Sequence, residues 1–287
     1  MLLASSANRT FQRLLDAALR VDGRGVLNSG VTEEAGGTEV AAELLMAVRM
    51  MQSEATTSDG RVDYKRLRES EAYLAYRSCT GRLVGFEPSA LTTVEERLAF
   101  WINLYNALIL DAVITFGIHG SIREDTGLFR RAAYMVGGRR YSADDIEHGI
   151  LRANRRHFHP AIPFPQFAPD DPRLRYSLPG VDPRVHCALV CASRSCPPFA
   201  TFDGEHIDEQ LDAAARSFVN GGAVASGGNG ASLRVSSIFR WYRRDFGGEK
   251  GVRDFISRYL EPGSVHDGLG KGSRLRYQPY DWSLNAA

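Results

Sequence analysis

Apolar residues recur every three or four positions through much of the first half of the chain, which is the spacing of helices that bury one face. The clearest stretch begins at Thr93 and continues towards Gly117. It is apolar on nearly every side, so we expect a buried central helix. Thr93 followed by Glu96 forms the capping-box pattern of a helix start. Similar patterns predict shorter helices at the N-terminus, from Glu39, over 63–79, over 206–218 and over 236–246.

Short apolar runs beside turn residues predict a few strands in the second half of the chain. Tyr134–Ser142 resembles two strands joined by a Gly-Gly turn, and Ser142 then caps a helix predicted over 143–152. The apolar run Val185–Cys191 predicts a buried strand, and residues 233–235 predict a short one. Helices dominate and no internal repeat is present. The expected fold class is therefore α+β, a helix-rich single domain with the buried central helix packed on a small, mainly antiparallel sheet.

Segments rich in glycine and proline mark the expected boundaries and loops. Residues 1–36 combine a short amphipathic helix with a glycine-containing stretch and predict a flexible lead-in, followed by one domain over 37–287. Residues 157–183 are rich in proline, phenylalanine and aspartate and predict a long irregular connection. The low-complexity segment 221–232 predicts a mobile loop.

Composition and charge narrow the classes of partner. The 287 residues carry a formal net charge of +1, which gives no field for nucleic acid or an anionic membrane, so we expect neither as a partner. The most apolar stretch, Leu98–Phe116, contains Asn103, Asn106 and Asp111, which indicates a core helix rather than a membrane span. Four cysteines are too few for a disulfide scaffold, and the N-terminus lacks a secretory pattern. We therefore expect an intracellular, cytoplasmic protein.

The densest group of reactive side chains lies within residues 184–199. This stretch holds three of the four cysteines together with His186. In a strand His186 and Cys191 point to opposite faces, so they meet only if the chain turns sharply after Val190. The small residues that follow Cys191 make such a turn feasible. Cys187 is most simply a core residue, because a free cysteine packs like a small hydrophobe.

Cys191 and Cys196 allow four interpretations that the residues alone leave open. They are core thiols, or one of them is a nucleophile with a histidine base, or both bind zinc with His186, or they form a redox pair. Zinc would need a fourth ligand that the sequence does not identify, and Cys-x4-Cys departs from the Cys-x-x-Cys of redox motifs. The candidate bases are His186 and His148, and the candidate groups to orient them are Glu147, Asp144 and Asp281.

Polar residues inside apolar elements are further candidates. Asn103 and Asn106 lie on one face of the central helix, where a buried amide without a partner costs about 1–3 kcal/mol. Each amide either ties a loop backbone to the core or serves a site, by orienting a catalytic group or donating to an oxyanion. Glu147 and His148 belong to a helix start rich in acids, which either complements the helix dipole or turns a side chain into a site.

Five segments in order resemble the uncharacterised family called domain of unknown function 547 (DUF547), over about two-thirds of the chain. The segments are 96–106 (ERLAFWINLYN), 145–151 (DIEHGIL), 182–198 (DPRVHCALVCASRSCPP), 237–246 (SIFRWYRRDF) and 280–285 (YDWSLN). The resemblance implies a family core over about 90–287, with His186, Cys191 and Cys196 at recurring positions. It implies no established activity, and a domain that is found alone or fused to glutaredoxin-like and DEP domains.

The same elements resemble, more weakly, papain- and transglutaminase-like folds. Those folds carry a nucleophilic cysteine on a buried helix, a histidine on a following strand and an aspartate or asparagine beyond. Here Asn103 stands where that cysteine would lie, while His186 and Asp281 match the other two positions. The departure at Asn103 implies an inactive relative, a nucleophile recruited from Cys191 or Cys196, or no relationship.

These patterns together predict a thiol-centred pocket that acts as a cysteine-dependent hydrolase or acyl transferase on a small-molecule or peptide substrate, without a cofactor. Cys196 or Cys191 would attack, His186 would serve as base, and Glu147 or Asp281 would orient it. One alternative is a non-catalytic interaction or scaffold module with core cysteines and a protein partner. The other is a structural zinc-binding domain.

Overall fold

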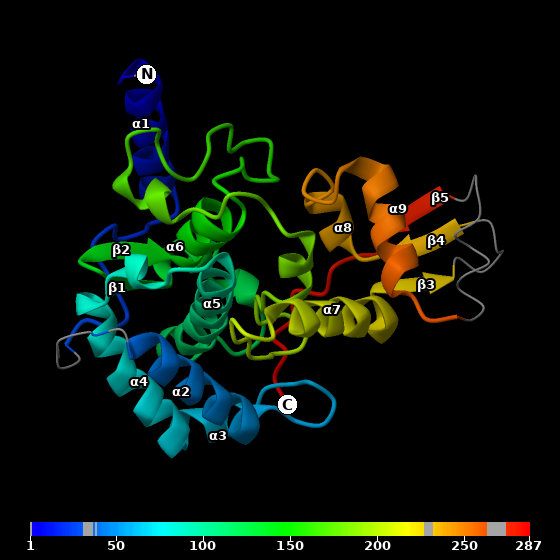
Figure 1. Ribbon diagram of the computed structural model, residues 1–287, viewed down its shortest axis with the longest axis horizontal. Helices are drawn as coiled ribbons and strands as arrows, with labels where there is room; N and C mark the ends of the chain where they lie inside the picture. Colours follow the sequence, from blue (N-terminus) through cyan, green and yellow to red (C-terminus); the bar gives the residue numbers. More distant parts are fainter. Residues whose placement is uncertain (1, 31–36, 38, 227–231, 263–273) are drawn as a thin grey trace.

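Short helices arranged around one long helix make up most of the structure (Figure 1). The computed structural model describes residues 2–30, 37, 39–226, 232–262 and 274–287. The α-helices are α1 (Leu2–Ala18), α2 (Val40–Ala55), α3 (Tyr64–Glu69), α4 (Glu71–Arg82), α5 (Val94–Phe116), α6 (Leu128–Arg131), α7 (Ile207–Phe218), α8 (Ser237–Trp241) and α9 (Gly248–Tyr259). The strands are β1 (Ala133–Val136), β2 (Arg139–Ser142), β3 (Val224–Ser226), β4 (Ser232–Val235) and β5 (Arg274–Tyr277).

Short helices of other types connect these elements. The 3-10 helices are η1 (Leu83–Gly85), η2 (Pro88–Ala90), η3 (Ile122–Glu124), η5 (Pro172–Tyr176) and η6 (Pro183–Cys187). Two segments are π-helical, η4 (Asp145–Leu151) and η7 (Val219–Ala223). Both η4 and η6 carry residues that the sequence singles out as functional candidates.

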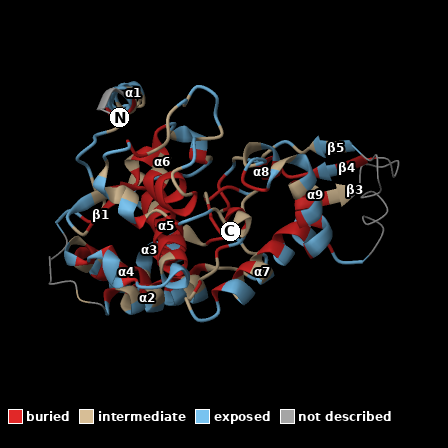
Figure 2. Cartoon of the chain, turned by 45° about the horizontal axis from the view of Figure 1, so that its top comes forward, coloured by how far each residue is buried: buried red, intermediate tan, exposed pale blue. Residues whose placement is uncertain are grey.

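The central helix α5 is buried along most of its length, as its apolar sequence predicts (Figure 2). Every residue from Leu98 to Val113 is buried. The capping box is present: the Thr93 hydroxyl accepts a hydrogen bond from the Glu96 N–H at 3.0 Å, and the Glu96 carboxylate accepts one from the Thr93 N–H at 3.0 Å. Gly117 ends the helix with a left-handed φ of 66°, a conformation that glycine adopts without steric cost.

Among the helices in the described part of the chain, α5 alone is long and apolar enough to cross a membrane. Of its most apolar window, 89% is buried inside the fold, and core helices commonly have this composition. The polar Asp111 within it is bound by the Tyr73 hydroxyl at 2.6 Å and by Arg77 at 2.5 Å. The prediction of a buried core helix is therefore confirmed.

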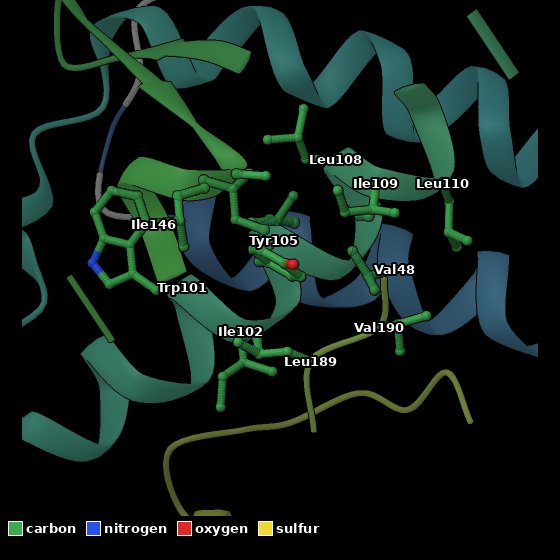
Figure 3. Packing of buried hydrophobic residues seen from close by; sticks show 14 of the residues in the cluster. Val48, Trp101, Ile102, Tyr105, Leu108, Ile109, Leu110, Ile146, Leu189 and Val190 are labelled. Atoms are coloured by element: carbon green, nitrogen blue, oxygen red, sulfur yellow. The ribbon is translucent and has the colours of Figure 1, made fainter. Parts of the chain in front are cut away.

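The main hydrophobic core forms where α5 meets α2 and the segment that follows η6. Figure 3 shows Leu189 beside Ile102 of α5, and Val190 near Val48 of α2; all four belong to one cluster of buried residues. The β1–β2 hairpin adds to this cluster from another direction, with the rings of Trp101 and Tyr141 5.0 Å apart. The segment that carries the candidate cysteines thus begins deep in the core.

The strands form two small sheets at opposite ends of the molecule (Figure 1). β1 and β2 pair antiparallel as the predicted hairpin, with Ala133 opposite Ser142. In the other sheet β4 lies between antiparallel β3 and parallel β5. A second hydrophobic cluster joins this sheet to α7, α8 and α9. The prediction of a helix-rich α+β fold with mainly antiparallel strands is confirmed, with the strands divided between two sheets.

The prediction of a buried strand at Val185–Cys191 is wrong. Residues up to Cys187 form η6 instead, and no strand follows directly. The Asp182 side chain accepts a hydrogen bond from the Arg184 N–H at 2.9 Å, and Pro183 occupies the first turn, which together start a helix. Because the segment is buried in either conformation, its apolar run could not distinguish them.

Two predicted helices differ in extent from the observed ones. The helix predicted over 63–79 is two helices, because Ser70 ends α3 and its hydroxyl accepts a hydrogen bond from the Tyr73 N–H at 3.1 Å, capping α4. The helix predicted over 236–246 ends at Trp241, and the residues after it form turns.

The N-terminal residues expected to be a flexible lead-in are packed on the domain where the structure describes them. Asn28 is buried, and its side-chain amide donates to the Thr80 carbonyl at 2.9 Å. In α1, the Asn8 amide donates to the Pro165 carbonyl at 3.0 Å. The loop expected to be mobile, 221–232, contributes residues to β3 and β4, and its centre lies outside the described residues.

Candidate functional site

One cavity collects most of the side chains that the sequence singles out. It has a volume of about 490 Å³ and is bordered by α1, α5, η4, η6, α8 and the C-terminal tail. The sequence candidates that line it are Asp144, Glu147, His148, His186, Cys191 and Cys196. Asn103 and Asp281 are not among its lining residues.

The chain turns directly after Cys191, as a site shared with His186 requires. Ala192 has a left-handed φ of 62°, which is uncommon for a residue other than glycine. The Cys196 N–H donates to the Ser193 carbonyl at 3.0 Å and closes the turn. An N–H of the C-terminal tail donates to the Ala192 carbonyl at 2.9 Å. The turn is therefore hydrogen-bonded to the C-terminal tail, and both His186 and Cys191 line the cavity.

The Asn106 side chain joins residues 188–190 of the cavity wall to α5, because its amide both donates to and accepts from their backbone. Its amide donates to the Ala188 carbonyl at 2.9 Å, and its side-chain oxygen accepts from the Val190 N–H at 2.8 Å. Asn103 makes the same pair of bonds with Phe202, at 2.6 Å and 3.0 Å. Both amides thus tie loop backbone to the core, which is the structural role that the sequence left open.

His186 is oriented by Asp245, a residue that we did not select from the sequence. Its Nε2 lies 3.0 Å from Asp245 Oδ2, and both side chains are 1% exposed. Arg152 Nε donates to the same oxygen at 2.6 Å. Burial opposes ionisation, but the hydrogen bonds from His186 and Arg152 hold the pKa of Asp245 well below its usual range. The carboxylate can only accept, so the His186 proton resides on Nε2.

The other nitrogen of His186 is thereby left as an acceptor. Burial lowers the pKa of His186, so the ring is neutral and Nδ1 carries a lone pair. No residue in the described part of the chain hydrogen-bonds this nitrogen. The ring also stacks on Tyr242, with centroids 3.9 Å apart and planes 18° from parallel. The sequence held one signal for Asp245: it lies in the family-like segment 237–246.

The segment η4 begins where the sequence predicts a helix over 143–152, but its hydrogen bonding is π-helical. The Ser142 hydroxyl accepts from the Asp145 N–H at 3.1 Å, so the predicted cap is present. The Arg152 N–H donates to the Glu147 carbonyl, five residues back, at 2.8 Å. Single π-helical turns occur often at functional sites. Here the turn brings the neighbours Glu147 and His148 to one cavity.

Glu147 contacts two phenols and makes no hydrogen bond to His186. Its Oε1 accepts from the Tyr242 hydroxyl at 2.5 Å, and its Oε2 accepts from the Tyr105 hydroxyl at 3.2 Å. Burial first, and the Glu147 charge second, raise the pKa of both tyrosines well above the ordinary value, so both remain donors. The orienting role expected of Glu147 is occupied by Asp245.

His148 and Asp144 form a second imidazole–carboxyl pair. Arg152 Nη1 lies 2.8 Å from His148 Nδ1, and because a guanidinium only donates, Nδ1 must accept. Burial lowers the pKa of His148 well below its usual value, so its proton resides on Nε2, 4.0 Å from Asp144 Oδ1. Burial, opposed by Arg130, raises the pKa of Asp144 to about 7. A carboxyl that titrates near neutral pH is suited to acid–base chemistry.

Cys191 and Cys196 form a disulfide in the cavity wall. The Tyr280 hydroxyl lies 3.1 Å from Cys191 Sγ and 3.2 Å from Cys196 Sγ. The Ser193 hydroxyl donates to the Tyr280 oxygen at 3.0 Å. The turn at Ala192 brings the sulfurs together despite the Cys-x4-Cys spacing. One interpretation of the sequence is that Cys191 and Cys196 are thiols of the hydrophobic core. In the structure they are bonded to each other and line a cavity instead.

The other two cysteines are free and buried. Cys187 belongs to the second hydrophobic cluster and is 2% exposed, as expected of a core residue. Burial raises the pKa of Cys79 to about 11 and that of Cys187 far above the ordinary thiol value. Neither thiol forms a thiolate at neutral pH, so neither competes with the cysteines of the cavity.

Two further expectations find no geometric support. Asp281 is exposed, and its carboxylate accepts from the Ser283 N–H at 2.9 Å, so it stabilises a turn of its own tail and orients no histidine. Over the residues whose positions are described, no three His, Cys, Asp or Glu side chains converge in a way that could hold a metal ion. The zinc interpretation therefore has no ligand set there.

The comparison with family models supports the resemblance found in the sequence. The model described as "Protein of unknown function, DUF547" matches residues 88–219. The match includes α5, η4 and the segment with His186 and both cavity cysteines. Asp245 and Tyr280 lie beyond it, within the two C-terminal segments that resemble the family. No curated protein and no solved structure matches the chain.

Proposed function

This chain belongs to the DUF547 family, whose function is unknown, and from its cavity we propose that it is a cysteine-dependent hydrolase or acyl transferase. One observation carries the proposal: the same cavity is lined by a pair of cysteines and by His186, which a buried carboxylate orients. A nucleophile, a base and a group that orients the base are the three parts that such chemistry needs. The volume is in the range of small-molecule sites.

The active form in this proposal is the reduced one. Acyl transfer to cysteine requires a thiolate, which neither sulfur supplies while the two are bonded to each other. Two electrons and two protons from a small cellular dithiol convert the disulfide to two thiols, and the dithiol becomes a disulfide in turn. Oxidation of Cys191 and Cys196 therefore switches the site off.

Cys191 is the better candidate for the nucleophile. Both cysteines line the cavity with His186, but Cys196 also lines a second pocket of about 680 Å³, which residues 57–61 and 193–198 border. A thiol that enters this second pocket meets the sulfur of Cys196. Its attack there forms a mixed disulfide with Cys196 and releases Cys191 as a free thiolate inside the cavity.

The reaction follows from the protonation of His186. Its Nδ1 takes the proton of the Cys191 thiol, directly or through one water molecule. The sulfur bonds to the acyl carbon, the bond to the leaving group breaks, and His186 gives the proton to the leaving group. Water or another acceptor then attacks the acyl carbon, His186 takes its proton, and the carbon–sulfur bond breaks to restore the thiol. With water, the products are the acid and the protonated leaving group.

One hydroxyl group beside Cys191 is suited to stabilise negative charge. The Tyr280 hydroxyl lies 3.1 Å from Cys191 Sγ, and because Ser193 donates its proton to the Tyr280 oxygen, Tyr280 keeps its own proton for the sulfur. Burial raises the pKa of Tyr280 far above its ordinary value, so the phenol keeps its proton and donates. A donor at this distance from the sulfur is suited to stabilise the Cys191 thiolate in the reduced protein.

The proposal is tested by treating the protein with an electrophilic acyl probe and locating the adduct by peptide mass spectrometry. We expect one adduct, on Cys191, in the reduced protein and none in the oxidised protein. Cys191→Ser should abolish it. Cys196→Ser should retain it without a requirement for reductant. The buried Cys79 and Cys187 serve as internal controls within each sample.

Two results would overturn the proposal. Unchanged labelling of the Cys191→Ser/Cys196→Ser protein would show that the reactive group lies elsewhere. Reduced protein that takes up no acyl group, combined with cysteine variants that lose stability alone, would favour a non-catalytic interaction module.

A further inference from the structure

We infer that the cavity accepts an uncharged aliphatic acyl chain, and that α1 determines the length of chain that fits. The acyl part of this inference rests on the proposed function. The chain preference rests on the cavity wall itself, in particular on Leu15 of α1 and on Leu19 directly after it. These residues lie outside the part of the chain that the family model matches.

α1 is held against the cavity by polar contacts as well as by packing. Arg130 Nε bonds the Asp16 carboxylate at 2.7 Å, and Arg130 Nη2 donates to the Gln12 side chain at 2.9 Å. At the end of the helix, a Cβ on Gly127 would lie 3.0 Å from the Leu19 carbonyl, so the backbone there approaches α1 closely. The position of Leu15 and Leu19 at the cavity is thus fixed by contacts with residues 127–130.

Other parts of the cavity wall are also apolar. Phe129 and Ile162 line it together with Leu15 and Leu19, and aromatic rings line it from α8 and the tail. Among these rings, Trp241 stacks on Phe158 with centroids 5.5 Å apart and on Trp282 with centroids 5.4 Å apart. A chain that starts at Cys191 therefore runs between apolar surfaces.

The charged groups of the cavity disfavour a ligand with a negative head group. The Arg130 guanidinium lines the cavity, but it is paired with the Asp16 carboxylate at 2.7 Å and lies 3.8 Å from Asp144. Glu147 adds a carboxyl group to the lining, and burial lowers the pKa of His157 to about 3, so that ring is neutral. Among the described residues that line the cavity there is no lysine and no arginine besides Arg130, which favours a neutral acyl group over a carboxylate or phosphate.

The inference is tested with non-reactive amides on the full-length Cys191→Ser protein, so that binding is measured without acyl transfer. Calorimetric titration with butanamide, hexanamide and octanamide should give a Kd that falls about threefold to fourfold for each added CH₂. Leu15→Arg should weaken octanamide by about tenfold or more and butanamide much less. Leu14→Arg is the matched control, because Leu14 is 66% exposed on the neighbouring position of the same helix.

A second variant guards against loss of α1 packing. Leu19→Ala leaves the residues of α1 unchanged and enlarges the cavity, so it should shift the preference towards decanamide. A Kd independent of chain length, or equal weakening by Leu15→Arg and Leu14→Arg, would overturn the inference. Tighter binding of octanoate than of octanamide would overturn the inference that the head group is neutral. If the amides bind as expected while Cys191 takes up no acyl group, the proposed function fails and the chain preference stands.

Discussion

At the scale of single residues, the chemistry of the cavity depends on which imidazole nitrogen carries a proton. The Asp245 carboxylate accepts from His186 Nε2 and so fixes the proton of His186 there. Arg152 donates to His148 Nδ1, so the proton of His148 also lies on Nε2. Burial keeps both rings neutral at neutral pH. A buried imidazole with one free lone pair is the form that a general base requires. The partners that create this state are themselves charged and buried, which makes them sensitive to substitution.

Asp245→Asn should lose both reactivity and stability. The variant keeps the size of the side chain but leaves Arg152 buried without its anion, and breaking a buried ion pair costs about 3–5 kcal/mol. The His186 proton is no longer fixed on Nε2, so the acylation rate of Cys191 should fall at every pH. Asp170→Asn is the control, because the Arg9–Asp170 pair is exposed and contributes little to stability. Equal acylation rates in the wild type and Asp245→Asn would contradict the orienting role.

Asp144 should make the free energy of unfolding depend on pH in a defined direction. Burial raises its pKa from 3.8 to about 7, so between these values the folded protein keeps a proton that the unfolded chain has lost. The contribution of this group therefore destabilises the fold as pH rises through that window. Asp144→Asn removes the titration, so relative to the wild type the variant should gain stability as the pH rises from about 5 to about 7.

Urea unfolding at both pH values measures this difference. Asp170→Asn again provides the control, because its carboxyl has a lowered pKa and stays ionised in both states over this range. If the difference in free energy of unfolding between Asp144→Asn and the wild type stays constant or shrinks as the pH rises, burial does not raise the pKa of Asp144 as stated.

At the scale of elements, local signals identified what local contacts determine. The capping box at Thr93 and the apolar faces of α5 predict the central helix, because the bonds that start it lie within three residues. Val185–Cys191 was predicted wrongly because its apolar run is equally compatible with a strand, although Asp182 and Pro183, which start η6, stand directly before it. The backbone after η6 is bonded by Asn106, more than eighty residues earlier. The π-helical form of η4 had no signal in the spacing of its residues.

The two asparagines of α5 should differ in their effect on the site although they make equivalent bonds. Asn106→Leu leaves the Ala188 carbonyl and the Val190 N–H buried without a partner, which should destabilise the protein by about 3 kcal/mol. It should also slow acylation, because this backbone leads into Cys191. Asn103→Leu should cost similar stability but leave the acylation rate unchanged, since its partner Phe202 does not line the cavity.

Chemical denaturation and acylation kinetics on the two variants separate these effects. An equal loss of acylation in both would mean that general destabilisation, rather than the position of the Cys191 segment, governs reactivity.

At the scale of the whole molecule, the cavity is assembled from segments far apart in the sequence. Glu147 meets Tyr242 across 95 positions, and His186 meets Asp245 across 59. The sequence identified His186, Cys191 and Cys196 because they are clustered, and all of them line the cavity. It missed Asp245, Tyr280 and the wall formed by α1, because nothing in the local spacing connects these residues to the cluster. For the same reason Asp281, chosen for its residue type, lies away from the site.

The chemistry proposed for this cavity depends on a covalent acyl intermediate on reduced Cys191. Its most direct test is an active-site titration, in which a chromogenic octanoyl ester is mixed rapidly with the protein and release of the leaving group is followed in time. We predict a burst of about one equivalent per chain in the reduced protein, followed by slower turnover. The oxidised protein and Cys191→Ser should give no burst. Reduced wild type without a burst, or a full burst in Cys191→Ser, would contradict the claim.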